Sequence, residues 1–137
     1  MKNKKLLVGL FTILSPIIFT GCDKEKKLIC SQEEPSSTAE LSYSFKNDKL
    51  NKFEMKYTLN FEEVNDVQFQ TSQETDYCEK TKGIVNDSYK TCKQEVKGRK
   101  LIVKSTVDLN KYTELNDKTL DEIKAKYKNE NYDCVVK

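Results

Sequence analysis

Apolar and polar residues alternate strictly along two neighbouring stretches of the chain, residues 41–46 and 53–62. Every odd-numbered position in both carries a large apolar or aromatic side chain, and every even-numbered position is polar. This alternation is typical of strands with one buried side and one solvent-facing side. The turn-forming residues Asn47-Asp48-Lys49 separate the two stretches, so the pattern predicts an antiparallel hairpin.

A second pair of strands is predicted further along the chain, from Ser88 to Val96 and from Lys100 to Leu109. The sequence Lys97-Gly98-Arg99 supplies the turn between them. A short extended segment, from Tyr132 to Val136, closes the chain.

Two helices interrupt these strands. Asn65 can cap a helix from about Asp66 to Lys80, with Gln68 at the third helical position and a basic last turn. Thr119-Leu120-Asp121-Glu122 is a capping box that opens a second helix. The order ββαββαβ predicts an α+β fold, a mostly antiparallel sheet of about four to five strands with two helices on one face.

The start of the chain has a different pattern. Three lysines precede an apolar run over residues 6–19, and a strongly charged stretch follows it. The run contains Pro16 and is shorter than the roughly 20 apolar residues that a membrane-spanning helix needs. This pattern predicts a secretory signal peptide.

The end of that segment, Phe19-Thr20-Gly21-Cys22, resembles a bacterial lipobox. The resemblance implies cleavage between Gly21 and Cys22 and attachment of a lipid to Cys22. The thiolate of Cys22 is a nucleophile suited to accept that lipid. Phe19 departs from the usual Leu, Val or Ile at its position. The alternative is an ordinary signal peptide with an incidental cysteine.

The expected organisation therefore has three parts: a lipoprotein signal peptide (1–21), a lipidated tether (22–38) and a small α+β domain (39–137). The tether is predicted from its charged, Ser- and Pro-containing sequence. Leu28-Ile29-Cys30 interrupts it and is expected to form a short strand. We expect the protein at the extracytoplasmic face of the cell membrane, held by its lipid.

Charge excludes one class of partner. All 22 acidic residues follow Cys22, whereas three of the 24 basic residues precede it. The mature chain therefore has a formal charge of −1, which argues against nucleic-acid binding.

Four cysteines remain after Cys22, and outside the cytoplasm an even number predicts disulfides. Three pairings are open. We favour Cys30 with Cys134, which would join the two ends of the domain, and Cys78 with Cys92, which would close a local loop. A four-thiolate zinc site is the alternative, but it needs close pairs of the C-x-x-C kind, and none occurs. We therefore expect no metal and no cofactor.

Catalytic chemistry is also not expected. The chain contains no histidine, which excludes Ser-His-Asp and Cys-His sites. Adjacent carboxylates are interpreted as structural: Glu33/Glu34, Glu62/Glu63 and Asp121/Glu122. Tyr43 and Tyr57 fall on the predicted inward side of the hairpin, whereas the other tyrosines could form a surface patch for a glycan or protein: Tyr77, Tyr89, Tyr112, Tyr127 and Tyr132.

The domain resembles a family of small, uncharacterised bacterial lipoproteins, the YehR-like proteins. The residues that carry the resemblance are the lipobox, the hairpin sequence from Leu41 to Leu50, the segment Tyr77–Gly83 and the closing Tyr132-Asp133-Cys134. The resemblance implies a cell-envelope lipoprotein with an α+β fold. We expect a non-enzymatic binding or interaction module whose partner is an envelope protein or small ligand. The alternatives are an inhibitor of an envelope hydrolase and an accessory solute-binding protein.

Overall fold

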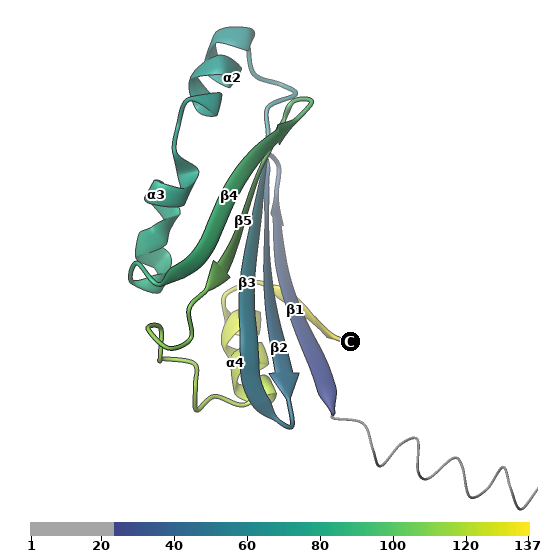
Figure 1. Cartoon of the computed structure of the whole chain (residues 1–137). Helices are drawn as coiled ribbons and strands as arrows, with labels where there is room; N and C mark the ends of the chain where they lie inside the picture. Colours follow the sequence, from purple (N-terminus) through teal and green to yellow (C-terminus); the bar gives the residue numbers. More distant parts are fainter. Residues whose placement is uncertain (1–23) are drawn as a thin grey trace, which may run out of the picture.

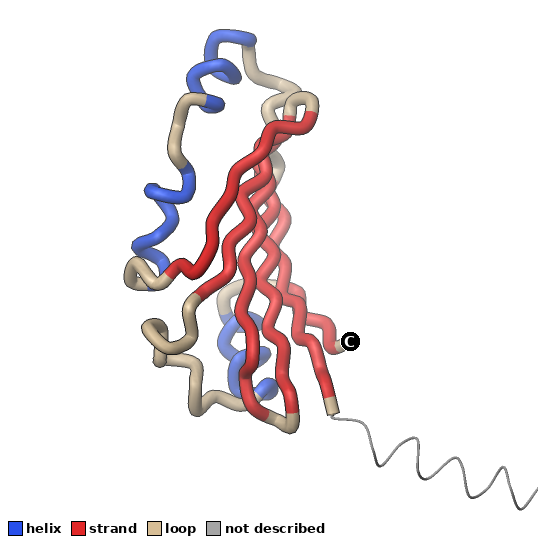
Figure 2. The backbone as a smooth tube through the Cα atoms, viewed as in Figure 1, coloured by secondary structure: helices blue, strands red, loops and turns tan. Residues whose placement is uncertain are grey.

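The computed structural model describes residues 24–137. The predicted signal peptide (1–21), its cleavage position after Gly21 and the lipid-accepting Cys22 lie outside the described residues. The described chain is an α+β domain built on a single antiparallel sheet, in agreement with the predicted class (Figures 1 and 2). Within residues 24–137, no helix has the length and apolar character needed to cross a bilayer.

The sheet has six strands in the order β4-β5-β3-β2-β1-β6. Two-residue turns connect β2 to β3 and β4 to β5, and positive φ angles at Asn47, Asp48 and Gly98 match the turns that such hairpins favour. The strands are β1 (Glu25–Glu34), β2 (Ser37–Lys46), β3 (Lys49–Asn60), β4 (Tyr89–Lys97), β5 (Lys100–Val107) and β6 (Asp133–Val136).

In the described part of the chain, three α-helices and one 3-10 helix accompany the sheet: α2 (Asp66–Gln73), α3 (Tyr77–Thr81), η1 (Lys82–Val85) and α4 (Leu120–Asn129). The caps at both predicted helix starts are confirmed. The side chain of Asn65 accepts a hydrogen bond from the Gln68 N–H at 2.9 Å, and Thr119 and Glu122 form the capping box of α4.

The hydrophobic core lies on one face of the sheet. The fully buried Val85 of η1 and Ile123 of α4 belong to the same cluster as the inward side chains of the strands. Helix α2 buries no residue and extends beyond the sheet (Figure 1). The strand residues in this core are Leu28, Cys30, Leu41, Tyr43, Phe45, Phe53, Met55 and Val107.

The predicted tether is wrong for most of its length, and the domain does not begin at Ala39. Residues Glu25–Glu34 form β1, which lies between β2 and β6 and buries Leu28 and Cys30 completely. Only the middle of β1 is buried, so its polar ends resemble a linker in composition. This strand is the reason why the sheet has six strands and not four to five.

The single helix predicted over residues 66–80 is also wrong, because it is divided into α2 and α3. The side chain of Gln94 on β4 forms hydrogen bonds with two backbone groups at the break between the helices. Its amide nitrogen donates to the Thr75 carbonyl, and its amide oxygen accepts from the Tyr77 N–H, each at 2.9 Å. Asp76 then caps α3 by accepting from the Glu79 N–H at 3.0 Å. A contact from the sheet thus replaces the hydrogen bonds of a continuous helix.

Both disulfides join the pairs that the sequence favoured. Cys30 of β1 is bonded to Cys134 of β6, directly opposite in the ladder. Cys78 of α3 is bonded to Cys92 of β4. The first disulfide closes the sheet at the end of the chain, and the second attaches a helix to it.

Candidate functional site

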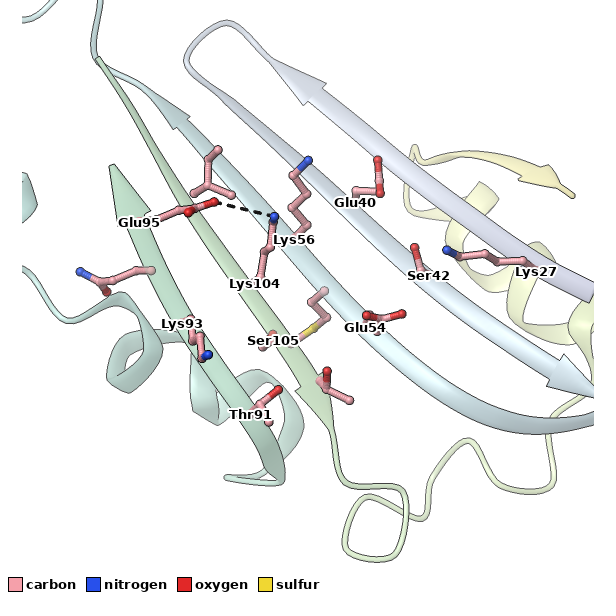
Figure 3. Close-up of a pocket in the computed structure, with 14 residues that line it drawn as sticks. Lys27, Glu40, Ser42, Glu54, Lys56, Thr91, Lys93, Glu95, Lys104 and Ser105 are labelled. Atoms are coloured by element: carbon pink, nitrogen blue, oxygen red, sulfur yellow. Dashed lines mark ion pairs between the residues drawn. The ribbon is translucent and has the colours of Figure 1, made fainter. Parts of the chain in front are cut away.

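The face of the sheet opposite the core carries a groove of about 710 Å³. Successive side chains of a strand point to opposite faces, so residues between the core positions form most of this surface. The buried Met55 and Ser105 border it from the core side. Figure 3 shows their polar side chains projecting from neighbouring strands. The groove is lined by Lys27, Glu40, Ser42, Glu54, Met55, Lys56, Thr91, Lys93, Gln94, Glu95, Ile102, Lys104, Ser105 and Thr106.

This groove, which we call the sheet groove, carries charges of both signs. Lys93, Lys104 and Lys56 lie opposite one another on β4, β5 and β3, and Glu40 follows on β2. One ion pair crosses from β5 to β4, between the Lys104 ammonium and the Glu95 carboxylate at 3.7 Å (Figure 3). Both side chains are about half exposed, and such exposed pairs contribute little stability, roughly 0–1 kcal/mol. A ligand can therefore replace these pairs with its own charges at low cost.

All residues that line the sheet groove belong to strands β1 to β5. The groove thus has a floor but no wall from a helix or loop. Small-molecule sites usually bury most of their ligand between several elements. The geometry of the sheet groove consequently suits the surface of a macromolecule better than a small molecule.

A second cavity, of about 530 Å³, lies on the core side between the sheet, η1 and α4. We call it the tyrosine cleft, because its walls include Tyr57, Tyr112, Tyr127 and Tyr132. Ile84 also lines it and remains 57% exposed. Its volume falls in the range of about 300–1,000 Å³ that is usual for small-ligand sites.

The aromatic rings around the tyrosine cleft form a continuous stack. Buried Tyr43 stacks on Phe53 at 4.5 Å between ring centroids and lies 5.7 Å from Tyr127. Tyr127 meets Tyr132 edge to face at 5.3 Å. Such contacts stabilise ring pairs beyond the area that they bury, so the wall of the cleft is held in a defined shape.

Burial raises the pKa of the phenols in this stack and of Tyr57 beside it in the cleft wall. Desolvation is the largest cause for Tyr43, Tyr57 and Tyr127. For Tyr112, burial and then the hydrogen bond with Glu114 raise the pKa to about 12. Because the hydroxyls of Tyr57, Tyr112 and Tyr127 stay protonated and these residues line the cleft, they can donate hydrogen bonds to a bound ligand.

The five tyrosines of the predicted surface patch do not lie together in the structure. Tyr112, Tyr127 and Tyr132 line the tyrosine cleft. Tyr89 instead donates to the Thr81 hydroxyl at 2.7 Å, and the Tyr77 N–H bonds Gln94 in the break between two helices. The predicted inward position of Tyr43 is confirmed, since the residue is fully buried.

The three carboxylate pairs lie on different elements. Glu33 and Glu34 end β1, Glu62 and Glu63 follow β3, and Asp121 and Glu122 occupy the first turn of α4. Among residues 24–137, no cluster of three or more Cys, Asp or Glu side chains is arranged to hold a metal ion.

Sequence reasoning missed the sheet groove. The alternation of residues did indicate which side chains face away from the core, including Glu54 and Lys56. It could not show that the outward sides of five strands combine into one groove, because that depends on the order of the strands.

Comparisons with known proteins give only the fold. No protein-family model matches the chain, and no curated protein matches it either. The chain is similar in structure to a protein from Streptococcus pneumoniae TIGR4 that was solved by NMR. The TM-score is 0.51 at 8% sequence identity, and the match covers 83% of this chain and 86% of the other.

Proposed function

We propose that this protein is a lipid-anchored, non-enzymatic interaction module on the extracytoplasmic face of a bacterial membrane. The observation that carries the proposal is the open sheet groove, whose floor comes from strands alone and which presents charges of both signs. A surface of this kind is suited to a macromolecular partner with complementary charges. The resemblance to YehR-like lipoproteins is part of the same proposal.

The anchor is supported by the lipobox-like sequence ending at Cys22 and by the two disulfides of the domain, since such bonds persist outside the cytoplasm. Two acyl chains would hold the protein stably at a membrane, whereas one alone would bind marginally. The Cys22→Ala variant is therefore expected to appear in the medium or to remain unprocessed. Absence of labelled fatty acid from the wild-type protein would overturn the anchor.

Cross-linking in intact cells tests the interaction. The sheet-groove variant Lys56→Glu/Lys93→Glu/Lys104→Glu reverses three exposed charges and should lose the captured partner. A matched control, Lys100→Glu/Lys111→Glu/Lys128→Glu, makes the same change of net charge outside the groove and should keep it. Equal capture by both variants would show that the groove is not the binding surface.

The identity of the captured protein separates the alternatives. Stoichiometric recovery of one envelope hydrolase, together with loss of its activity in the presence of this protein, would favour the inhibitor alternative. Turnover of an envelope substrate by the purified protein would contradict a non-enzymatic role.

The tyrosine cleft favours a second candidate function, the binding of a small solute. A bound solute stabilises the folded state, and the rise in melting temperature depends on solute concentration. Ile84→Lys places a charged side chain at an exposed position of the cleft and should abolish that rise. Val67→Lys changes another exposed apolar residue, 74% exposed on α2, and should leave it unchanged.

A further inference from the structure

One end of the sheet, which we call the basic end, carries a concentration of lysines. Here β1 begins, β2 turns into β3, and Lys137 pairs with Lys27 (Figure 1). Acidic residues near this end include Glu25, Asp48 and the Asp121/Glu122 pair at the start of α4, together with Glu54, whose carboxylate pairs with the Lys52 ammonium at 3.3 Å. The lysines, all exposed, are Lys24, Lys26, Lys27, Lys46, Lys49, Lys52 and Lys137.

Five of these lysines surround one groove of about 410 Å³, which we call the basic groove. Glu25 is the one acidic residue in its lining. Phosphate groups match such a site, because ammonium groups bind them as point charges. The lysines of the basic groove are Lys26, Lys27, Lys46, Lys52 and Lys137.

The backbone at this end is fixed as far as Lys24. The Asn47 N–H donates to the Lys24 carbonyl at 2.9 Å, and the Lys24 N–H donates to the Asn47 side chain at 3.4 Å. Lys27 and Lys137 exchange two backbone hydrogen bonds, of 2.9 and 2.8 Å. Strand β1 therefore begins almost directly after Cys22 in the sequence, without the tether that the sequence predicted over residues 22–38.

This proximity limits how far the basic groove can be from the lipid. Cys22 and Glu25 are three positions apart in the sequence, and an extended chain covers at most about 3.6 Å per residue, or about 11 Å here. The Debye length at physiological ionic strength is about 8 Å. The start of β1 is therefore at most little more than one Debye length from the anchor, a distance at which a charged membrane surface still acts on its lysines.

The opposite end of the sheet has the opposite charge balance. Lys97, Arg99 and Lys100 lie there at the β4–β5 turn. They are outnumbered by five acidic residues at the ends of β1 and β3 and the start of α2: Glu33, Glu34, Glu62, Glu63 and Asp66. The domain is thus electrically polarised along its strands, with the positive end at the start of β1.

We propose that the basic end docks on the phosphate groups of anionic phospholipids in the membrane that holds the Cys22 anchor. This inference rests on the proposed lipid anchor. The lysines add an electrostatic contact to the acyl chains, and the docked domain stands on its basic end. The sheet groove and the tyrosine cleft then open along the plane of the membrane and not toward the bilayer.

Lysine acylation followed by mass spectrometry tests the docking on the full, processed lipoprotein in vesicles. In vesicles that contain phosphatidylglycerol, Lys26, Lys46 and Lys49 should be protected relative to vesicles of phosphatidylcholine alone. Lys97 and Lys100 should react equally in both. About 1 M salt should remove the protection, since it shortens the screening length to about 3 Å.

The variant Lys26→Gln/Lys46→Gln/Lys49→Gln should lose protection of the remaining Lys24 and Lys52, by about fivefold for each lysine replaced. The matched control Lys97→Gln/Lys100→Gln/Lys111→Gln should retain it. Equal labelling on the two kinds of vesicle, or protection that resists salt, would overturn the docking while leaving the anchor intact. A Cys22 peptide without lipid in the same mass spectra would overturn both proposals, so the two failures are distinguishable.

Discussion

Cys30 and Cys134 lie directly opposite each other on β1 and β6, and their disulfide joins residues that are 104 positions apart. Cys30 is completely buried in the core. The bond therefore fastens the four-residue edge strand β6 to a strand inside the sheet. The Cys78–Cys92 disulfide spans only 14 positions.

Removing the longer disulfide should destabilise the domain more than removing the shorter one. The loss expected from chain entropy is about 4.7 kcal/mol for a loop of about 100 residues and about 3 kcal/mol for a 15-residue loop. Urea unfolding of Cys30→Ala/Cys134→Ala and of Cys78→Ala/Cys92→Ala measures the two losses of unfolding free energy. Equal losses in the two variants, or a larger loss in Cys78→Ala/Cys92→Ala, would show that loop length does not determine the contribution of each disulfide to stability.

Local patterns identified most strands and the helix caps, because each depends on a few neighbouring residues. Strict alternation marked β2 and β3, and the capping signals at Asn65 and Thr119 form the expected hydrogen bonds. The two favoured disulfides are likewise those of the structure.

The missed features depend on contacts between distant segments. Strand β1 has polar ends and becomes a strand through its pairing with β2 and β6. The break between α2 and α3 depends on Gln94, 19 positions after Thr75. The tyrosine cleft likewise requires Tyr57 of β3 and Tyr127 of α4 to line the same cavity, which no spacing in the sequence reveals.

Arg99 should control the order of the segment that leads into α2. Its guanidinium donates to the carbonyl oxygens of Phe61 and Val64 and to the Asp66 carboxylate, the last at 2.8 Å. It also lies 4.6 Å from the centre of the Phe69 ring. Lysine cannot reproduce this planar set of donors, so Arg99→Lys should accelerate amide hydrogen exchange in α2.

The control for Arg99 is Lys100→Arg, a change of the adjacent, exposed position. It should leave hydrogen exchange in α2 unaltered. Unchanged exchange in Arg99→Lys would mean that the segment is held by other contacts, such as the pairing of Phe61 with Phe69 at 5.5 Å.

Ser105→Ala should stabilise the protein. The Ser105 hydroxyl is buried between apolar neighbours on β5 and has no hydrogen-bond partner among the described residues. A buried polar group without a partner costs about 1–3 kcal/mol, so its removal should raise the unfolding free energy by about 1 kcal/mol. As a control, Ser44→Ala on β2 alters a serine that faces away from the core. This variant should change the unfolding free energy by less than about 0.5 kcal/mol. A loss of stability in Ser105→Ala would indicate a bond to ordered water.

Tyr43 should make the domain sensitive to alkaline pH. Burial raises the pKa of its phenol above the ordinary value of 10.0. Below pH 10 the phenol is protonated in both states and has no effect. Above pH 10 the unfolded chain releases the proton and the folded chain retains it, so the unfolding free energy falls with pH. The fall is about 1.4 kcal/mol per pH unit for each such tyrosine.

Urea unfolding of the wild type and of Tyr43→Phe between pH 9 and pH 11 measures this contribution. Because phenylalanine has no proton to release, the variant should lose less stability over the interval, by about 1.4 kcal/mol for each pH unit above 10. Phenolate absorbance gives a second measure, since Tyr43 should titrate only when the domain unfolds. Parallel pH profiles for the two proteins would show that the Tyr43 hydroxyl ionises within the folded core.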